Sequence, residues 1–215
     1  MRLKFLPSFV KRRGRITNKQ VHSLKSLSDF SVFTIDEILL ELKNFNQCCL
    51  EIGFGNAEHL VQQAINHPHT LFIGSEVYMS GIGTLISEIK ENNIKNIKIF
   101  SDDIRLLLDQ ETTEIFDSVQ IICPDPWPKD RHHKRRLINE DFLSMIHGFI
   151  KDKGNLYIST DWENYAESIQ GLLGSINLFI ESKKMYLEKN RLTKFEKRGE
   201  NEGREIYIFN YEKSS

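Results

Sequence analysis

Short apolar runs alternate with amphipathic segments along most of this chain, and that alternation limits the folds open to it. The apolar runs occupy residues 48–52, 70–76, 96–100, 119–123 and 156–161. Between them, apolar residues recur at helical spacing, as at Leu60, Val61 and Ala64 after the first run. Strands that alternate with helices build a mostly parallel sheet covered by helices on both faces. We therefore expect an α/β, doubly wound fold.

The remaining segments complete a sheet of seven strands and set the expected domain limits. Helices are expected over residues 26–46 and 81–92, after residue 103, from residue 139 to a stop at Gly154, and over 165–172. A sixth strand is expected over 176–187, a polar loop over 191–198 and an antiparallel last strand over 205–212. Residues 1–25 are expected to form a mobile basic arm, and residues 26–215 a single domain.

Four of the expected strands are followed by acidic residues. These are Glu76, Asp103, Asp125 and Asp161. In a doubly wound sheet, ligands bind outside the carboxyl ends of the strands. Packing of the core does not require acids at these positions, so together they indicate a ligand site at that edge of the sheet.

A Gly-x-Gly turn at Gly53 and Gly55 follows the first strand, and glycine lets a backbone approach a ligand closely. Glu76 follows Gly53 by 23 residues, the spacing of an acid that accepts hydrogen bonds from a ribose diol. Glu58 replaces the third glycine of G-x-G-x-x-G, which disfavours a pyrophosphate cradle. Asp103 could accept a hydrogen bond from an adenine amino group or cap the next helix.

The fourth strand ends in three prolines within five residues, Pro124, Pro126 and Pro128. Proline fixes φ and donates no hydrogen bond, so the strand must stop and the loop that holds Asp125 and Trp127 must be stiff. Residues 129–136 follow, with five Lys or Arg and two His. A rigid carboxylate and indole beside this charge suggest chemistry on a nucleic-acid base. The plainer alternative is a proline-rich turn before a solvated basic segment.

Positive charge is concentrated in two segments, although the net charge of the whole chain is −1. Residues 1–25 hold eight Lys or Arg and no acid, and residues 129–136 hold five against one acid. An otherwise acidic chain with two basic segments indicates a localised site for a polyanion. The arm could be plainly disordered, or it could order on an RNA backbone.

The composition also disfavours several other classes. No apolar run approaches the ~18 residues that span a membrane, and the N-terminus lacks the apolar core of a signal peptide. Serine is too sparse there for a typical transit peptide. Cys48, Cys49 and Cys123 form no C-x-x-C, which fits a reducing, cytoplasmic location. We expect no metal, because the cations around His132 and His133 would repel one.

Six segments, in the family's order, resemble the bacterial tRNA (guanine-N7-)-methyltransferase family. They are residues 8–17, 50–57, 74–78, 124–137, 159–162 and 192–198. The run Pro-Asp-Pro-Trp-Pro-Lys-Asp-Arg-His-His-Lys-Arg-Arg-Leu is the most specific, and the segments together span nearly the whole chain. Ala57 departs from the family pattern, which usually has glycine there, so we expect slightly tighter packing at the cofactor.

The resemblance implies a class I methyltransferase fold that binds S-adenosylmethionine and releases S-adenosylhomocysteine. It implies tRNA as the partner, its variable-loop guanosine (guanosine-46 in tRNA numbering) as the substrate, and no obligatory protein partner. The implied cofactor-binding residues are Glu51, Gly53, Gly55, Glu76, Asp103 and Asp125, of which Asp125 is also the catalytic candidate. The implied substrate-binding residues are Lys129, Asp161, Thr193, Lys194, Phe195 and Glu196. The expected phosphate contacts in the two basic segments are Arg131, Lys134, Arg135, Arg136, Arg12, Arg13 and Arg15.

The chemistry of this reaction asks little of the protein beyond placement. Guanine N7 carries a lone pair and no proton, so no general base is needed, and in-line placement with water excluded is the work that remains. Asp125 could accept hydrogen bonds from the Watson–Crick edge of guanine and favour the positive charge that builds on the purine. Trp127 could stack on the base or pack the loop.

Three other functions stay open on the sequence alone. A nicotinamide-dependent oxidoreductase is disfavoured by the missing G-x-G-x-x-G, and separate titrations with NADH and S-adenosylmethionine would decide. A methyltransferase acting on an exocyclic amine differs in the atom that is methylated. A non-catalytic RNA-binding module is disfavoured by the acids at the strand ends, and a methyl-transfer assay on tRNA would distinguish it.

Overall fold

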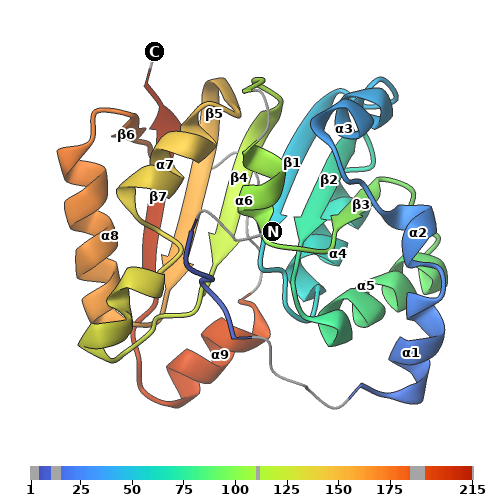
Figure 1. Ribbon diagram of the computed structural model, residues 1–215, viewed down its shortest axis with the longest axis horizontal. Helices are drawn as coiled ribbons and strands as arrows, with labels where there is room; N and C mark the ends of the chain where they lie inside the picture. The colour runs from blue at the N-terminus through green and yellow to red at the C-terminus, as the bar shows by residue number, and fades with distance from the viewer. Residues whose placement is uncertain (1–4, 11–15, 110–111, 185–191, 215) are drawn as a thin grey trace.

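Seven strands form one sheet in the computed structural model, which describes residues 5–10, 16–109, 112–184 and 192–214. The strands are β1 (Gln47–Ile52), β2 (Thr70–Ser75), β3 (Ile97–Phe100), β4 (Phe116–Ile122), β5 (Ile150–Thr160), β6 (Phe179–Glu181) and β7 (Tyr207–Lys213). Their order across the sheet is β3-β2-β1-β4-β5-β7-β6 (Figure 1). The first five in this order are parallel, and β7 is antiparallel to both of its neighbours. The doubly wound fold expected from the sequence is confirmed.

Helices cover both faces of the sheet. One face carries α4 (Glu58–Asn66) and α5 (Met79–Glu91), with α1 (Asn18–Leu24) and α2 (Leu27–Phe30) packed against α5. The other carries α3 (Ile35–Leu42), α6 (Ile104–Leu108), α7 (Glu140–His147) and α8 (Glu163–Ser175). Helix α9 (Lys194–Asn201) lies beyond the edge toward which the parallel strands point (Figure 1). Within the described ranges, no helix is both long and apolar enough to cross a membrane.

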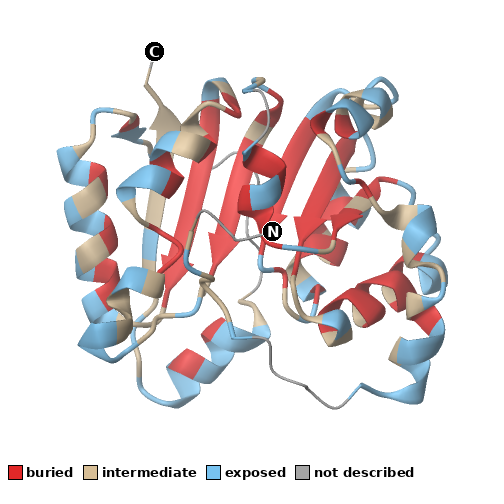
Figure 2. Cartoon of the chain, in the orientation of Figure 1, coloured by how far each residue is buried: buried red, intermediate tan, exposed pale blue. Residues whose placement is uncertain are grey.

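Two apolar clusters, one on each face, explain why the central strands are continuously apolar. In β1, Cys48, Leu50 and Ile52 join one cluster, and Cys49 joins the other. A strand that is buried on both faces cannot alternate between apolar and polar residues. Figure 2 shows this burial along the central strands. Because these strands are parallel, their carboxyl ends meet at one edge of the sheet, where the acids noted above are expected.

The N-terminal segment differs in part from the mobile arm expected over residues 1–25. Thr17 and Gln20 form a reciprocal capping box at the start of α1, with bonds of 3.3 Å and 2.8 Å between each side chain and the other's backbone N–H. Gly83 of α5 leaves room for α1, because a Cβ there would lie 2.9 Å from the Gln20 Cβ. The expectation is therefore wrong for α1, which packs on α5. Residues 11–15 lie outside the described part of the chain.

Residues 26–46 form α2 and α3 instead of the single helix expected. Ser31 is extended and pairs with Ile99 of β3 in an isolated parallel bridge. Thr34 then starts a new helix, because its Oγ1 accepts a hydrogen bond of 3.2 Å from the backbone N–H of Glu37. An N-cap in the middle of an apolar pattern was the signal against one continuous helix.

Helix α7 ends at His147, and not at Gly154 as expected. Gly154 lies inside β5, where a Cβ would come within 2.6 Å of the Ile150 Cγ2. The pairing of β4 with β5 is irregular here, with a register shift between Phe116 and Ser118. The glycine therefore permits a crowded strand irregularity, and the helix stops earlier because the next strand begins at Ile150.

The C-terminal elements also differ from the expectation. Strand β6 has three residues and does not extend over 176–187. The polar loop expected over 191–198 is wrong, because α9 begins at Lys194 behind a capping box between Thr193 and Glu196. Helix α9 has no broad apolar face, so its periodicity gives no signal, whereas the Thr-x-x-Glu spacing does.

Candidate active site

In the turn after β1, every second residue from 53 to 57 has a backbone in the left-handed region. Gly53, Gly55 and Ala57 have φ of +73°, +54° and +65°. A Cβ on Gly53 would meet no atom within 4 Å, so the backbone there is open to a ligand. A Cβ on Gly81 of α5 would lie 2.2 Å from the Gly55 carbonyl oxygen, so this glycine lets α5 pack against the turn. Ala57 is fully buried, and the effect of this residue on packing at the cofactor stays a prediction.

Glu76 follows β2 and binds the glycine turn. Its Oε2 accepts a hydrogen bond from the backbone N–H of Gly55 (2.8 Å), and its Oε1 accepts from Val77 (2.7 Å) and Tyr78 (3.0 Å). The side chain is 5% exposed. Burial raises the pKa of Glu76 and the charge of Asp125 raises it further, while the backbone donors oppose both. A desolvated carboxylate with acceptor capacity left thus lies next to the open turn.

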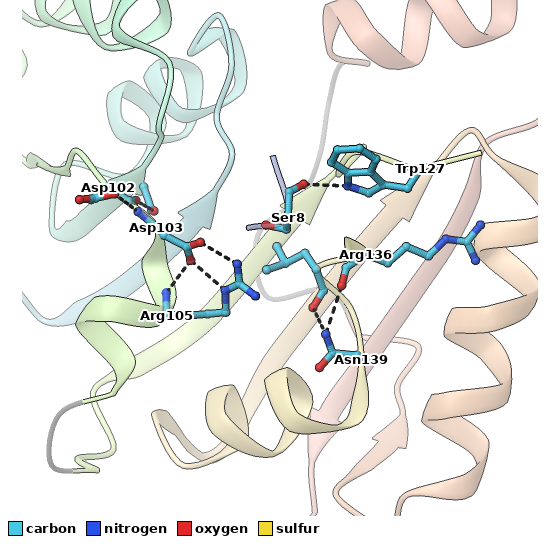
Figure 3. Close-up of polar contacts among 9 residues, drawn as sticks. Ser8, Asp102, Asp103, Arg105, Trp127, Arg136 and Asn139 are labelled. Atoms are coloured by element: carbon cyan, nitrogen blue, oxygen red, sulfur yellow. Dashed lines mark hydrogen bonds and ion pairs between the residues drawn. The ribbon is translucent and has the colours of Figure 1, made fainter. Parts of the chain in front are cut away.

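Asp103 is the N-cap of α6 and is bound by Arg105. Its Oδ1 accepts from the Arg105 backbone N–H (3.1 Å) and Nε (2.9 Å), and its Oδ2 accepts from Nη2 (2.7 Å) (Figure 3). Asp103 and Arg105 are buried, whereas Asp102 is exposed. The structure confirms the capping role of Asp103 and adds a bidentate ion pair, while the adenine contact stays a prediction. Arg105 does not stand out in the sequence, because no helix or strand pattern pairs side chains two positions apart.

The loop after β4 is held in an uncommon conformation. Cys123 and Trp127 have φ of +49° and +46°, a region that non-glycine residues rarely adopt. Trp127 Nε1 donates to the Ser8 carbonyl oxygen at 2.9 Å (Figure 3). The Arg135 guanidinium lies 4.8 Å from the centre of the indole ring. Trp127 therefore packs the loop, the second of its two expected roles. Asp125, between two prolines of this loop, is exposed.

Residues 5–10, which we call the N-terminal strap, cross three of the strand ends. Tyr78 after β2 donates its hydroxyl to the Val10 carbonyl oxygen at 2.9 Å. The Arg105 guanidinium, after β3, lies 3.9 Å from the centre of the Phe5 ring. Ser8 accepts from Trp127 after β4, as described above. The strap thus covers the same edge of the sheet as the acids, and no pattern in the sequence predicts this contact.

Arg136 is buried and does not make the phosphate contact expected of it. It is 6% exposed, its Nε donates to the Pro126 carbonyl oxygen (2.9 Å) and its Nη2 to the Asn164 Oδ1 (2.8 Å). Its guanidinium also lies 4.6 Å from the centre of the Tyr165 ring. Arg136 therefore fastens the proline loop to α8. Sequence alone does not distinguish this arginine from its cationic neighbours.

The rest of the cationic block remains available to a polyanion. Lys129, Arg131 and Lys134 are exposed, and Arg135 is half-buried on Trp127. They lie on or beside a short 3-10 helix, η1 (Asp130–Arg135). The three arginines of the arm, Arg12, Arg13 and Arg15, lie outside the described residues.

Asp161, after β5, is held by the C-terminal end of α9. Its Oδ2 accepts from Arg204 Nε at 2.9 Å. A Cβ on Gly199 would come within 2.8 Å of the same carboxylate, so α9 packs directly against Asp161. The pair is partly exposed, with side-chain exposures of 17% for Asp161 and 31% for Arg204. A carboxylate at this depth can still reach a ligand at the strand ends.

Glu196 is fully buried, and its carboxylate is used inside the protein. One oxygen accepts from the Thr193 backbone N–H and hydroxyl, both at 2.8 Å, and the other from the Ser159 hydroxyl at 3.0 Å. In this conformation the carboxylate is therefore not accessible to a substrate, and the substrate contact expected of Glu196 stays a prediction. Lys194 and Phe195, on the same turn of α9, are exposed.

Phe195 lies over the glycine turn. A Cβ on Gly55 would be 2.8 Å from the Phe195 ring, and a cavity of only about 20 Å³ remains between α9, Glu51 and the turn. A larger cavity of about 670 Å³ lies on the outer side of α4, between that helix, α5 and the start of α9. It is separate from the strand-end acids at Glu76, Asp103 and Asp125, so the site is defined by the strand ends and not by this cavity.

Glu51, at the end of β1, is 4% exposed, and its Oε2 is 2.8 Å from Nδ1 of His59 on α4. The carboxyl ends of four adjacent strands, β3, β2, β1 and β4, bring together the cofactor-binding residues expected from the sequence, which are Glu51, Gly53, Gly55, Glu76, Asp103 and Asp125. His59 was not singled out from the sequence, although its place in the first turn of the helix after Gly-x-Gly points it back toward β1.

Methyltransferases are among the solved structures that share this fold. The 16S rRNA methyltransferase KamB matches with a TM-score of 0.62 and 11% identity over 86% of this chain and 96% of that chain. A 16S rRNA (adenine(1408)-N(1))-methyltransferase from Catenulisporales acidiphilia, solved with the cosubstrate SAM, matches with 0.57 and 16% over 84% and 91%. At such identities the likeness concerns the fold, which is that of the class I methyltransferases.

Sequence comparison narrows this class to one family. A family model described as "Putative methyltransferase" matches residues 46–209. The tRNA (guanine-N(7)-)-methyltransferase of Nitrosomonas europaea is 40% identical over 89% of each chain. The enzyme of the same name from Nitrosococcus oceani is 38% identical over 97% of this chain and 91% of its own. This chain belongs to the tRNA (guanine-N(7)-)-methyltransferase family.

Proposed function

We propose that this chain transfers a methyl group from S-adenosylmethionine to N7 of the variable-loop guanosine of tRNA, position 46 in tRNA numbering. The observation that carries the proposal is the place of Asp125, on a proline-fixed loop between the glycine turn and the exposed cations. Relatives named for this reaction support it. A cytoplasmic location belongs to the proposal, because the substrate is a tRNA and none of the three cysteines, all described, is in a disulfide.

The strand ends fit the cofactor chemically. Its hydrogen-bond donors are two ribose hydroxyls, an adenine amino group and an α-ammonium group, and carboxylates are acceptors for all of them. Glu76 would accept from the ribose, Asp103 would line the adenine end, and the open backbone at Gly53 would allow close approach. Phe195 would move off Gly55 to admit the amino-acid part, because the cavity there has about 20 Å³. When bound, the cofactor supplies a methyl group on a sulfonium, which is a strong electrophile.

Asp125 would position the base and not remove a proton. Guanine N7 presents a lone pair, whereas the N–H groups of guanine are on its Watson–Crick edge. A carboxylate fixed between Pro124 and Pro126 can accept from that edge and lower the free energy of the charge that develops on the purine. RNA bases are reached most easily in loops, where they can be splayed out, which fits a variable-loop target.

The other substrate contacts follow from exposure. Lys129, Lys194 and the ring of Phe195 are exposed near the same edge and would contact the nucleotide, with Asp161 behind them. Glu196 and Thr193 would act through the cap of α9, since Glu196 is buried in this conformation. Phosphate contacts would come from Arg131, Lys134 and Arg135, and from the arm arginines named above.

Removing the Glu76 carboxylate should weaken cofactor binding. We expect Glu76→Ala to weaken S-adenosylmethionine by about 1–3 kcal/mol, the cost of leaving a polar partner unpaired in a desolvated site. Titration calorimetry measures this directly, and thermal unfolding of the variant shows how much the loss of three backbone hydrogen bonds contributes. Unchanged affinity would remove Glu76 from the cofactor site.

Binding of tRNA should fall steeply as salt rises. If phosphate contacts dominate, log K against log[salt] has a slope of about −0.7 to −0.9 for each contact, because counterions are released. Arg131→Ala with Lys134→Ala should weaken binding and flatten the slope by about two contacts. Lys95→Ala, an exposed cation before β3, is the matched control and should leave both unchanged. A salt-independent affinity in the unsubstituted protein contradicts a phosphate-dominated interface.

The position of the target is tested with two tRNA transcripts that differ at one base. Transfer of a labelled methyl group is measured on a transcript with guanosine at position 46 and on one with adenosine there. We expect incorporation to be lost with adenosine, since adenine also has a lone pair on N7 but presents a different Watson–Crick edge from the one that Asp125 would recognise. Equal incorporation into both transcripts would show that another nucleotide is modified.

A further inference from the structure

Glu51 has less hydrogen bonding than a buried carboxylate normally requires. It is 4% exposed, and within the described part of the chain His59 is its one hydrogen-bond partner, at 2.8 Å. A carboxylate has about four acceptor sites, and a buried charge is costly unless it is well partnered. Glu51 also borders the small cavity between the glycine turn and Phe195. Its unused acceptor sites therefore lie where a ligand of the turn would be bound.

The fold brings His59 to this carboxylate by close packing of α4 on the sheet. Glu51 pairs in register with Gly74 of β2, so both point toward α4. A Cβ on Gly74 would lie 2.6 Å from Leu60 and 2.9 Å from Phe54, so only glycine allows the helix to approach this closely. Its first turn then sets the imidazole against β1, where the side chain is only 7% exposed.

Gln63, one turn along α4, contacts the second ring nitrogen of His59. Its amide nitrogen lies 3.3 Å from His59 Nε2. With the amide in this orientation its nitrogen donates and Nε2 accepts, which puts the proton of the neutral ring on Nδ1, facing Glu51. The arrangement is a chain of amide, imidazole and carboxylate in which each member orients the next.

We propose that His59 is a positioning residue for cofactor binding, which holds the Glu51 carboxylate toward the α-ammonium group of S-adenosylmethionine. This inference rests on the proposed function. Among the donors of the cofactor, the ribose and adenine groups belong to the ends of β2 and β3, which leaves the α-ammonium group for the acid at the end of β1. With Nδ1–H in place, one oxygen of Glu51 is fixed and the other is aimed at the cavity.

The test separates a hydrogen-bond role from a packing role. His59→Asn keeps a donor, because the amide nitrogen is as many bonds from the backbone as Nδ1, but it loses volume. His59→Leu keeps volume and has no donor, and His59→Ala has neither. The affinity for S-adenosylmethionine is measured by calorimetry for each, alone and combined with Glu51→Gln, together with thermal unfolding. His69→Leu, in the exposed loop after α4, is the matched control.

We expect His59→Leu and His59→Ala to weaken the affinity for S-adenosylmethionine about 10-fold, the scale of one hydrogen bond to a charged group. The affinity of His59→Asn for the cofactor should stay within about 3-fold of that of the unsubstituted protein. In tRNA methylation, the KM for the cofactor should rise while kcat at saturation is unchanged, and the effect of Leu should vanish when Glu51→Gln is present. Equal losses for Asn and Leu, or additive losses with Glu51→Gln, would overturn the proposal while the unsubstituted enzyme still methylates tRNA. No binding of the cofactor by the unsubstituted protein would instead overturn the proposed function.

Discussion

Replacing Asp125 with alanine is expected to lower the turnover of tRNA methylation at least ~100-fold, the scale seen when one preorganised electrostatic contact is lost. The reason is its place: an exposed carboxylate fixed between two prolines, where the base would meet the methyl donor. Thermal stability should change little, because exposed groups contribute little to folding. The affinity for tRNA should also be nearly unchanged, since phosphate contacts dominate it.

The matched control for this variant is Asp130→Ala. Asp130 lies in the same loop region, and its side chain is fully exposed, at 101%. The Asp130→Ala substitution removes the same charge, and this variant should keep near-full turnover. The pH–rate profile of the unsubstituted enzyme adds a second check, because an acceptor without a proton gives no limb from a general base above neutral pH. If Asp125→Ala keeps near-full turnover, or if the rate rises with a base-like pKa, the role given to Asp125 is wrong.

Replacing Arg136 with alanine is expected to cost about 3 kcal/mol of unfolding free energy, because it removes the two hydrogen bonds of a buried charged group, and such bonds contribute about 1.5–3 kcal/mol each. The Pro126 carbonyl oxygen and the Asn164 Oδ1 would both lose their donor, and Tyr165 would lose a stacked guanidinium. For a chain of this size that corresponds to a fall in Tm of about 6–12 °C. Calorimetry or circular dichroism measures it directly.

Arg131→Ala is the matched control for Arg136→Ala, since both change an arginine of the same cationic block. Arg131 is exposed, so its loss should change stability by less than about 0.5 kcal/mol and weaken tRNA binding instead. The two variants should thus show opposite patterns in stability and in binding. Equal Tm values for the two would contradict the structural role of Arg136.

The sheet could be predicted from the sequence because its strands are buried on both faces, which makes each a continuous apolar run. Features that depend on tertiary contacts could not be predicted from the sequence. Gly154 looks like a helix stop by composition, but its position inside β5 depends on packing against Ile150. Helix α1 forms because α5 offers a place for it at Gly83, far along the chain. Helix α9 lacked an apolar face, and only its capping box signalled it.

The site follows the same division. Acids at strand ends can be placed from sequence, because a parallel sheet brings those ends together. The hydrogen-bond partner of each acid cannot be predicted from the sequence, because that partner is set by tertiary contacts. Asp103 is engaged by Arg105, and Glu196 is buried against Ser159. Likewise, Arg136 and Arg131 are alike in sequence and differ only because α8 lies beneath one of them.

The most direct measurement of the central claim is mass spectrometry of nucleosides from tRNA incubated with the protein and isotopically labelled S-adenosylmethionine. The proposed function predicts that the label is recovered as N7-methylguanosine, with one methyl group for each tRNA. A site built to place a lone pair, without a general base, leads to that atom. Recovery of the label on an exocyclic amine of a base, or no label in tRNA at all, would contradict it.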